Sequence, residues 1–174
     1  MSGGGFTVRR LEIADVPDAR AIERRCFPTP WSEAMFVLEI SKASSVCLAA
    51  EQDGSLVGYL CATRYAAIWH VMNVSVAPEH RRHGIATGLL NELFRLTEGE
   101  TSAHYTLEVR VSNEPAIEMY GHNGFRSAGL RRGYYADNRE HAVIMWRSTD
   151  PNFVPPNAAN PSEWAQQGGK RVGE

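Results

Sequence analysis

The stretch of sequence that decides the fold is NVSVAPEHRRHGIA, residues 73–86. It predicts a strand, a tight turn at Pro78, a loop of arginine, histidine and glycine, and a helix that begins at Ile85. The first N–H groups of a helix have no partner within it and lie at the positive end of its dipole, and the arginines add positive charge. Gly84 has no Cβ, so a ligand can approach the backbone closely. The stretch therefore predicts a site for a phosphate or pyrophosphate group.

The segments around this stretch alternate between strand and helix patterns. Seven segments are predicted to be strands, the first because apolar and polar residues alternate along it. They are expected at residues 6–12, 46–51, 56–63, 68–76, 105–111, 125–130 and 142–147. Asp53-Gly54, between the second and third strands, is a strong hairpin signal.

Apolar residues at helical spacing predict four helices. Asp15 is expected to cap the first, which must stop near Phe27 because the prolines after it disfavour helical conformation. Ser32 caps a second, short helix, and Asn113 caps the last, which ends at Asn123-Gly124. The third helix packs on the sheet through a face formed by Ile85, Leu89, Leu93 and Leu96.

Length and composition predict one domain. The chain has 174 residues, enough for one domain with a core and too few for two of ordinary size. Its 43% of apolar and 22% of charged residues are typical of a soluble globular protein. We expect a flexible N-terminus at 1–5, a folded domain at 6–148 and a disordered proline-rich tail at 149–174, because the tail has no apolar period.

Charge and cysteine usage argue against several classes of protein. The net charge of −2 gives no bulk electrostatic reason to expect nucleic-acid binding. Cys26, Cys47 and Cys61 are odd in number and lack metal-ligand spacing, which predicts small buried side chains in a reducing compartment. His80 and His83 have no third ligand nearby, so no metal site is expected.

The N-terminus has neither the basic region nor the apolar stretch of a signal peptide. No run approaches the roughly 20 apolar residues of a membrane span. These patterns predict a cytoplasmic protein that does not bind membranes, and a monomer is the favoured oligomeric state.

Three motifs follow one another along the chain: RRHGIA at 81–86, LEVR at 107–110, and a segment at 113–125 that ends in MYGHNGF. Together they resemble the GCN5-related N-acetyltransferase (GNAT) superfamily, whose R/Q-x-x-G-x-G/A loop binds the pyrophosphate of acetyl-CoA. FPTPWS at 27–32 and RRGYY at 131–135 are similar to the RimI-type ribosomal-protein alanine N-acetyltransferases. The sequence departs from the loop pattern at Ala86, where many members have glycine.

This resemblance implies an α/β fold with one mixed, mostly antiparallel sheet of six or seven strands and helices on both faces. It implies transfer of acetyl from acetyl-CoA to the N-terminal α-amine of a protein with a small first residue such as Ala, as in ribosomal protein S18. The amine would attack directly in a ternary complex. The resemblance also assigns Glu108 as the base and Tyr120 as the acid, with no metal.

The chemistry tolerates a weak base. An α-amine has a pKa of about 8 and is partly neutral in the cytoplasm, so a carboxylate suffices. Glu108 lies between two apolar residues on a strand, and its side chain points to the face opposite theirs. The alternative to a catalytic role is an ion pair with Arg110, which lies two residues further on and shares its face. For Tyr120, periodicity alone favours packing in the core, and only the resemblance favours a catalytic role.

The resemblance assigns the remaining site residues. The strand backbone of Val74, Ser75 and Val76 would contact the pantetheine arm. The pyrophosphate would be surrounded by a loop made of Arg82, His83, Gly84, Ile85, Ala86 and Thr87. Asn113, a helix cap, would also contact CoA. Core packing of the two valines and a solvated loop are the alternatives. Phe27, Trp31, Tyr134 and Tyr135 would bind the peptide, with packing between loops as the alternative and Tyr134 as the best candidate.

Two other functions remain open from the sequence. The same fold could acetylate a lysine side chain or a small-molecule amine, because fold does not determine substrate. A non-catalytic CoA-binding module is the alternative from another class.

Overall fold

The computed structural model describes residues 5–99 and 103–156. The chain forms two compact units. The first unit consists of Met1–Thr63 and Val71–Thr97, and the second of Arg64–His70 and Glu98–Glu174. Strand β4 (Ile68–Val76) contributes to both, since its first three residues lie in the second unit and the others in the first.

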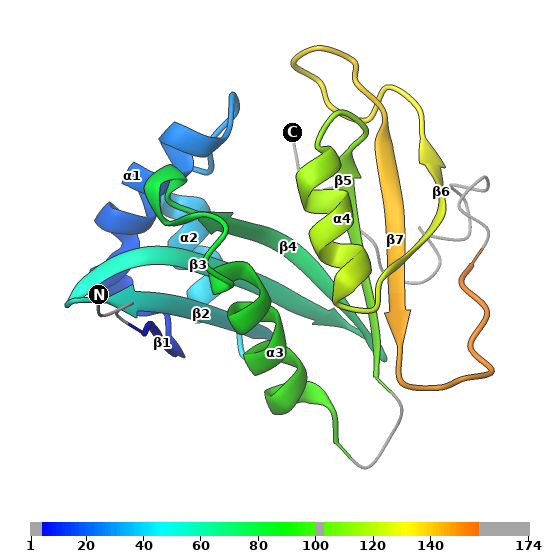
Figure 1. The fold of residues 1–174 in the computed structure, drawn as a ribbon, viewed down its shortest axis with the longest axis horizontal. Coiled ribbons are helices and arrows are strands. Elements are labelled where there is room, and N and C mark those ends of the chain that lie inside the picture. Colours follow the sequence, from blue (N-terminus) through cyan, green and yellow to red (C-terminus); the bar gives the residue numbers. More distant parts are fainter. Residues whose placement is uncertain (1–4, 100–102, 157–174) are drawn as a thin grey trace. The chain divides into compact units, whose positions relative to one another are not determined.

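Seven strands are hydrogen-bonded in the order β1-β2-β3-β4-β5-β7-β6 (Figure 1). Four of the strand pairs are antiparallel (β1–β2, β2–β3, β5–β7 and β6–β7), whereas β4–β5 is parallel. The predicted mixed, mostly antiparallel sheet with flanking helices is confirmed. The strands other than β4 span Thr7–Arg10 (β1), Ser45–Gln52 (β2), Ser55–Tyr65 (β3), His104–Arg110 (β5), Arg126–Arg131 (β6) and Ala142–Ser148 (β7). The helices span Val16–Cys26 (α1), Glu33–Ser41 (α2), Ile85–Thr97 (α3) and Glu114–His122 (α4), with short 3-10 helices at Ile13–Asp15 (η1) and Pro78–His80 (η2).

In the first unit, β2 and β3 form the predicted hairpin. Asp53 and Gly54 have φ of 52° and 75°, as the two central residues of a type I′ turn require. The strands pair from Ser45↔Thr63 to Gln52↔Ser55. Figure 1 shows α1 and α2 on one face of these strands and α3 on the other.

Alternation along β2 supplies buried side chains to both faces. Cys47 and Ala49 belong to the core that α1 and α2 cover, together with Phe36 of α2. Leu48 and Ala50 are also buried, and because each follows one of these residues in the strand, their side chains point to the opposite face. Full burial of a leucine or phenylalanine side chain contributes about 1.5–3 kcal/mol, so this two-sided core holds the unit together.

In the second unit, β5 and β7 pair along their whole length, from His104↔Ser148 to Arg110↔Ala142. A small apolar cluster around Trp146 of β7 includes Phe153. The Phe153 ring stacks on His104 with centroids 4.2 Å apart. Ordered contacts therefore extend past residue 148, the predicted end of the domain. The part of the predicted tail that begins at residue 157 lies outside the described residues.

Two details of the helix predictions are wrong. Asp15 precedes α1, but its side chain accepts no hydrogen bond from that helix. Its carboxylate accepts hydrogen bonds from Arg9 at 2.8 and 2.9 Å and from the Glu12 N–H at 2.8 Å. Leu96 is 40% exposed, because the buried face of α3 turns toward Leu90 instead.

The other capping predictions are confirmed. Ser32 Oγ accepts a hydrogen bond from the Met35 N–H at 3.2 Å and begins α2. At the end of α4, Gly124 has a φ of 88°, a conformation that glycine adopts without steric cost.

Candidate functional site

The predicted site residues lie in both units, and the first unit contains the predicted phosphate loop, between η2 and α3. Arg82 and Gly84 have φ of 66° and 79°. A Cβ added at Gly84 would meet no described atom within 4 Å, so the space beside the loop backbone is open. The Gly88 N–H donates to the Gly84 carbonyl oxygen at 2.8 Å, and the N–H groups that precede this bond have no partner within the helix.

Polar contacts fix the start of this loop. Arg25, at the end of α1, donates two hydrogen bonds to Glu79, at 3.0 and 2.6 Å. Arg81 donates from Nε to the Val76 carbonyl oxygen and from Nη2 to Cys26 Sγ, both at 3.2 Å. Arg81 therefore holds the loop to β4 and α1 rather than pointing freely at a ligand.

Arg82 and His83 are placed differently from Arg81. Both are exposed, and within the described part of the chain neither side chain forms a hydrogen bond or an ion pair. Ile85 is buried and anchors the start of α3, while Ala86 and Thr87 are half-buried. The loop thus offers an anion one guanidinium, one imidazole and a helix N-terminus.

The strand before the loop presents its valines on the less buried face. Val74 and Val76 are half-buried, whereas Asn73 and Ser75, which alternate with them along the strand, are buried. The two valines are thus only partly packed, which leaves both core packing and backbone contact with a ligand as roles for this part of β4. A Cβ at Gly58 of β3 would lie 2.9 Å from the Ser75 carbonyl oxygen, so only glycine permits this close approach.

Phe27 and Trp31 stand at the two ends of the segment between α1 and α2, and both are half-buried. The Trp31 ring packs edge-on against Phe36 with centroids 5.3 Å apart and joins the core cluster of the first unit. Packing is therefore one role of Trp31. Contact with a substrate stays a prediction for both residues.

The second unit contains Glu108, on β5. Its side chain is only 5% exposed. His70 Nε2 lies 2.6 Å from Glu108 Oε2, and Arg131 Nη1 lies 3.5 Å from Oε1. Arg110, the partner that sequence spacing offered as an alternative, bonds to Asp137 and Glu140 instead.

The surroundings of Glu108 keep it ionised. Burial alone would raise the pKa of its carboxyl group, but the positive charge of His70, its hydrogen bond, and the charge of Arg131 together lower that pKa below its usual value. Oε1 is buried and accepts no hydrogen bond from any described residue. A buried carboxylate oxygen without a donor is costly, so this atom is a candidate acceptor for a ligand N–H.

Helix α4 carries the other predicted catalytic residue. Asn113 caps it, since its Oδ1 accepts a hydrogen bond from the Ala116 N–H at 3.3 Å. Tyr120 is 9% exposed and packs against Phe125 with ring centroids 5.6 Å apart. Burial raises the pKa of Tyr120 above its ordinary value, so the phenol stays protonated and able to donate.

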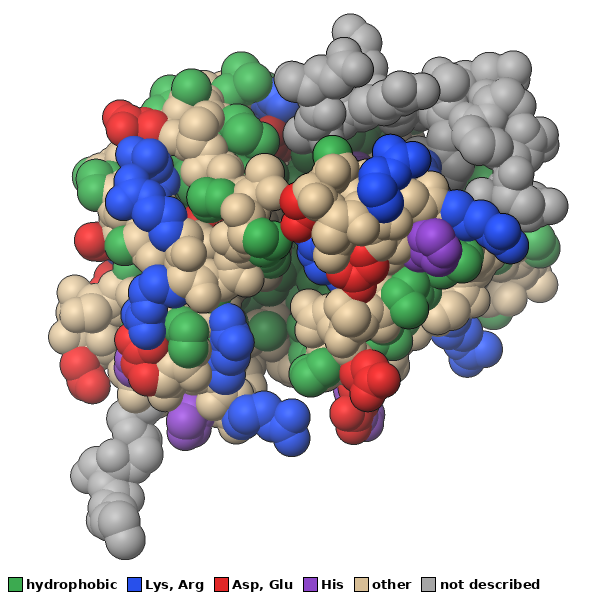
Figure 2. Space-filling view, turned by 90° about the horizontal axis from the view of Figure 1, so that it is seen from above, with side chains coloured by type: hydrophobic (Ala, Val, Ile, Leu, Met, Phe, Trp, Pro, Cys, Tyr) green, Lys and Arg blue, Asp and Glu red, His purple; other side chains and the backbone are tan. Residues whose placement is uncertain are grey.

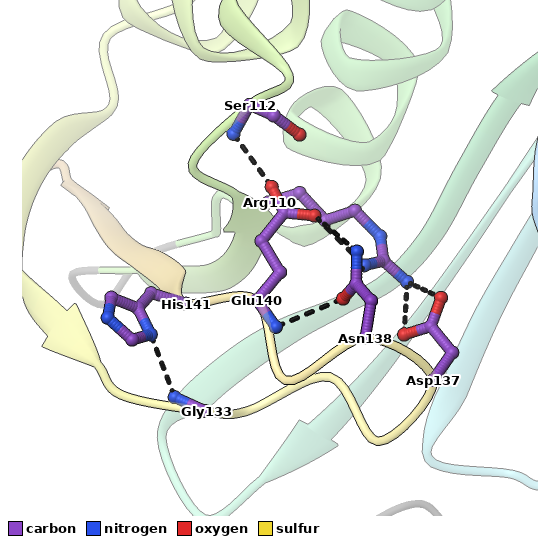
Figure 3. A network of polar contacts seen from close by, with 7 residues as sticks. All are labelled: Arg110, Ser112, Gly133, Asp137, Asn138, Glu140 and His141. Atoms are coloured by element: carbon purple, nitrogen blue, oxygen red, sulfur yellow. Dashed lines mark hydrogen bonds and ion pairs between the residues drawn. The ribbon is translucent and has the colours of Figure 1, made fainter.

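A polar network organises the loop between β6 and β7 (Figure 3). Arg110 on β5 donates two hydrogen bonds to Asp137, at 3.0 and 2.9 Å, and one to Glu140 at 3.1 Å. Glu140 also accepts from the Ser112 N–H at 2.9 Å. The Gly133 N–H donates to a ring nitrogen of His141 at 2.9 Å and closes the base of the loop. The network ties the loop to β5, two residues from Glu108.

Two tyrosines predicted to bind substrate lie on this loop. Tyr135 is half-buried, with the Arg110 guanidinium 3.9 Å from its ring centroid. Tyr134 is 40% exposed and packs edge-on against Tyr135 at 5.1 Å. Burial and the negative charge of Glu108 raise the pKa of Tyr134 to about 12. The Arg131 guanidinium, which pairs with Glu108, lies 5.5 Å from the centroid of the Tyr134 ring, so Tyr134 is an exposed side chain beside this ion pair.

Other kinds of site find little support. On the face that Figure 2 shows, basic and acidic side chains are interspersed. Across residues 5–99 and 103–156, no group of three or more His, Cys, Asp and Glu side chains could hold a metal ion. No helix in those ranges is long and apolar enough to cross a membrane.

The model of the acetyltransferase (GNAT) family matches residues 16–125, more than half of the chain. The chain belongs to the GNAT family. It is 34% identical over 141 residues to the ribosomal protein bS18-alanine N-acetyltransferase of Escherichia coli (strain K12), covering 80% of this chain and 95% of that protein. It is 32% identical over 158 residues to an N-alpha-acetyltransferase of Saccharolobus solfataricus, covering 83% and 94%.

Structures of GNAT enzymes agree with these relatives. The crystal structure of the ribosomal-protein-S18-alanine N-acetyltransferase from Escherichia coli matches with a TM-score of 0.76 and 32% identity, over 86% of this chain and 99% of that one. The predicted family, its RimI-type branch and the fold are therefore confirmed.

Sequence reasoning missed two residues of this GNAT site, His70 and Arg131. Both contact the Glu108 carboxylate from other strands, β4 and β6. His70 lies opposite Thr106 in the parallel β4–β5 pairing, so Glu108, two residues further along β5, is its diagonal neighbour. Arg131 begins the RRGYY motif, but nothing in the sequence pairs it with Glu108, and His70 is one of three polar residues in β4, with Asn73 and Ser75.

Proposed function

We propose that this GNAT protein transfers the acetyl group of acetyl-CoA to the N-terminal α-amine of a protein with a small first residue. Ribosomal protein S18 is the proposed target, because the Escherichia coli relative is named for it. The observation that carries the proposal is the state of Glu108. It is a buried carboxylate, ionised beside His70 and Arg131, with Oε1 accepting no hydrogen bond from the described residues.

In the proposed reaction the neutral amine attacks the carbonyl carbon of the thioester directly. As the N–C bond forms, the nitrogen loses a proton to Glu108, directly or through an ordered water. The C–S bond breaks, and Tyr120 donates its phenolic proton to the departing CoA thiolate. Exchange with solvent then removes the proton from Glu108 and restores the one on Tyr120. Because the α-amine has a pKa of about 8, a base of low pKa is sufficient.

The first unit would supply the binding of acetyl-CoA. Arg82, His83 and the backbone from Gly84 to Thr87 would surround the pyrophosphate. The exposed guanidinium of Arg82, which forms no hydrogen bond or ion pair with a described residue, supports this assignment, as do the open space beside Gly84 and the N-terminus of α3. The backbone of Val74–Val76 would pair with the pantetheine arm as an added strand does.

In the second unit, Tyr134 is the leading candidate for contact with the peptide, because it is exposed and its ring lies 5.5 Å from the Arg131 guanidinium, which pairs with Glu108. Tyr135 of the same unit, and Phe27 and Trp31 of the first unit, are the other residues proposed to contact the peptide.

The test is acetylation of a peptide that begins with Ala and contains an internal lysine. Intact mass and fragmentation should locate the acetyl group on the N-terminus. Acetyl on lysine alone would support the lysine acetyltransferase alternative and reject the proposal. Glu108→Gln and Tyr120→Phe should lose turnover and keep their affinity for acetyl-CoA. A wild-type protein that binds acetyl-CoA but acetylates no amine in a panel of first residues would be a binding module.

A further inference from the structure

Glu23, near the end of α1, is a buried carboxylate that the proposed mechanism does not use. It is only 1% exposed. The Trp31 N–H donates to Oε1 at 2.9 Å, and Asn73 Nδ2 donates to both oxygens at 3.2 and 3.1 Å. The Tyr59 hydroxyl donates to Oε2. All four residues belong to the first unit.

The partners of Glu23 make this an unusual carboxylate. Each donor is neutral, and no ion pair joins Glu23 to a cation among the described residues. A buried charge without a cation is expensive, and burial accordingly raises the pKa of Glu23. An apolar side chain would fill the same space at lower cost, so the hydrogen bonds themselves must matter.

Those hydrogen bonds hold both ends of the segment between α1 and α2. At one end, the Phe27 N–H donates to the main-chain carbonyl oxygen of Glu23 at 3.0 Å. At the other end, the Trp31 N–H donates to the Glu23 side chain. Pro28 and Pro30 lie between and have no N–H to donate. Among the described residues, both ends of this segment are therefore hydrogen-bonded to one residue of α1, the first end through its main chain and the second through its side chain.

We infer that Glu23 is a positioning residue for substrate binding: its carboxylate holds segment 27–31 in the conformation that accepts the peptide N-terminus. The inference rests on the proposed function, in which Phe27 and Trp31 contact the peptide. Glu23 itself is covered by Trp31, Tyr59 and Asn73 and contacts no substrate atom. Replacing Glu23 should therefore weaken peptide binding and should change neither acetyl-CoA binding nor the proton transfers.

Glu39 of α2 offers a matched control. It is another buried carboxylate, 4% exposed, in the same unit. It accepts hydrogen bonds from Ser45 Oγ at 2.7 Å, from Lys42 Nζ at 2.7 Å and from Thr63. These donors lie on β2, on β3 and after α2, and none belongs to segment 27–31. Its replacement should therefore cost stability without moving that segment.

The experiment compares Glu23→Gln and Glu23→Leu with Glu39→Gln and Glu39→Leu, using the Ala-start peptide. Glu23→Leu should raise the peptide KM about tenfold or more, as loss of a hydrogen bond to a charged group does, and leave the acetyl-CoA Kd within about twofold. Glu23→Gln keeps one carbonyl oxygen and should show a smaller rise, about threefold. Both Glu39 variants should keep the wild-type peptide KM to within about twofold, with a lower unfolding midpoint.

A double-mutant cycle with Phe27→Ala separates positioning from general destabilisation. If Glu23 acts through the segment, the effects of Glu23→Leu and Phe27→Ala on peptide KM should be less than additive. An unchanged peptide KM in a folded Glu23 variant, or full additivity, would overturn the inference. Should Glu23→Leu not fold, the same criteria apply to Glu23→Gln. If the wild-type protein itself fails to acetylate the peptide N-terminus, the proposed function fails first, and that outcome is distinct from either result on Glu23.

Discussion

Replacing His70 by leucine tests how the charge on Glu108 is maintained. The variant removes the contact of 2.6 Å between His70 Nε2 and Glu108 Oε2 while keeping a side chain of similar bulk. A hydrogen bond between charged groups contributes about 1.5–3 kcal/mol, and one pKa unit corresponds to about 1.36 kcal/mol. The pKa of Glu108 should therefore rise in the variant, because burial is then opposed only by the charge of Arg131 and a backbone hydrogen bond.

The sign of the kinetic effect follows from the role of Glu108 as a base. It acts only when ionised, and the native pKa lies below the usual value, so its activity is retained to low pH. In His70→Leu the carboxylate takes up a proton at a higher pH, and the acidic limb of kcat should move upward by about one unit or more. The charged or titratable groups that interact with Glu108 are His70, Arg131, Tyr134 and Tyr135.

The assay is kcat with saturating Ala-start peptide over about pH 5 to 9, read as CoA release. Protonation of the peptide amine lowers the rate in both proteins, so only the difference between their profiles reports on Glu108. The contacts of Glu140 with Arg110 and the Ser112 N–H in Figure 3 should not change over this range, because hydrogen bonds with them hold the pKa of Glu140 at about 2.

His104→Leu is the control, because His104 lies in the same unit and its Nδ1 forms a hydrogen bond of 2.8 Å with Ser148 Oγ, away from Glu108. Its pH profile should match that of the wild type. If His70→Leu also keeps the wild-type acidic limb, the reasoning that His70 maintains the charge on Glu108 is refuted.

Four further changes have expected outcomes. Glu108→Gln should lower kcat by about 10²–10⁴, the range for general acid–base catalysis, with an unchanged acetyl-CoA Kd by calorimetry. Arg82→Ala should weaken acetyl-CoA about tenfold, with a smaller salt dependence of Kd than the wild type; equal affinity would exclude a phosphate contact. Arg110→Gln should raise the peptide KM several-fold by releasing the loop of Tyr134 and should leave the acetyl-CoA Kd unchanged in the same titration. Gly58→Ala should lower the free energy of unfolding by about 1–3 kcal/mol in urea, because its Cβ would lie 2.9 Å from the Ser75 carbonyl oxygen.

Much of the fold follows from local patterns in the sequence. The Asp53-Gly54 turn, the Ser32 cap and the bounds of β4 could be predicted because each depends on a few adjacent residues. Asp15 shows the limit of this reasoning. Its residue type and position are those of a helix cap, yet its carboxylate accepts hydrogen bonds from Arg9 of β1 instead of from the helix.

The candidate site divides in the same way. The loop at 81–86 and the position of Glu108 were predictable, because spacing along one strand or one turn determines where such residues point. The partner of Glu108 was not, since Arg110 stands at the right spacing on the same strand but bonds to a loop 27 residues further on.

By itself, then, the sequence determined the order of strands and helices, the family resemblance and the residues proposed to carry out the chemistry. Only the tertiary structure decided the electrostatics around them: that His70 and Arg131 meet Glu108, and that Glu23 holds the segment before α2. The reason is physical. Capping, turn conformation and side-chain alternation act within a few residues, whereas the charge state of a buried carboxylate depends on which distant groups strand pairing and packing bring within about 4 Å of it.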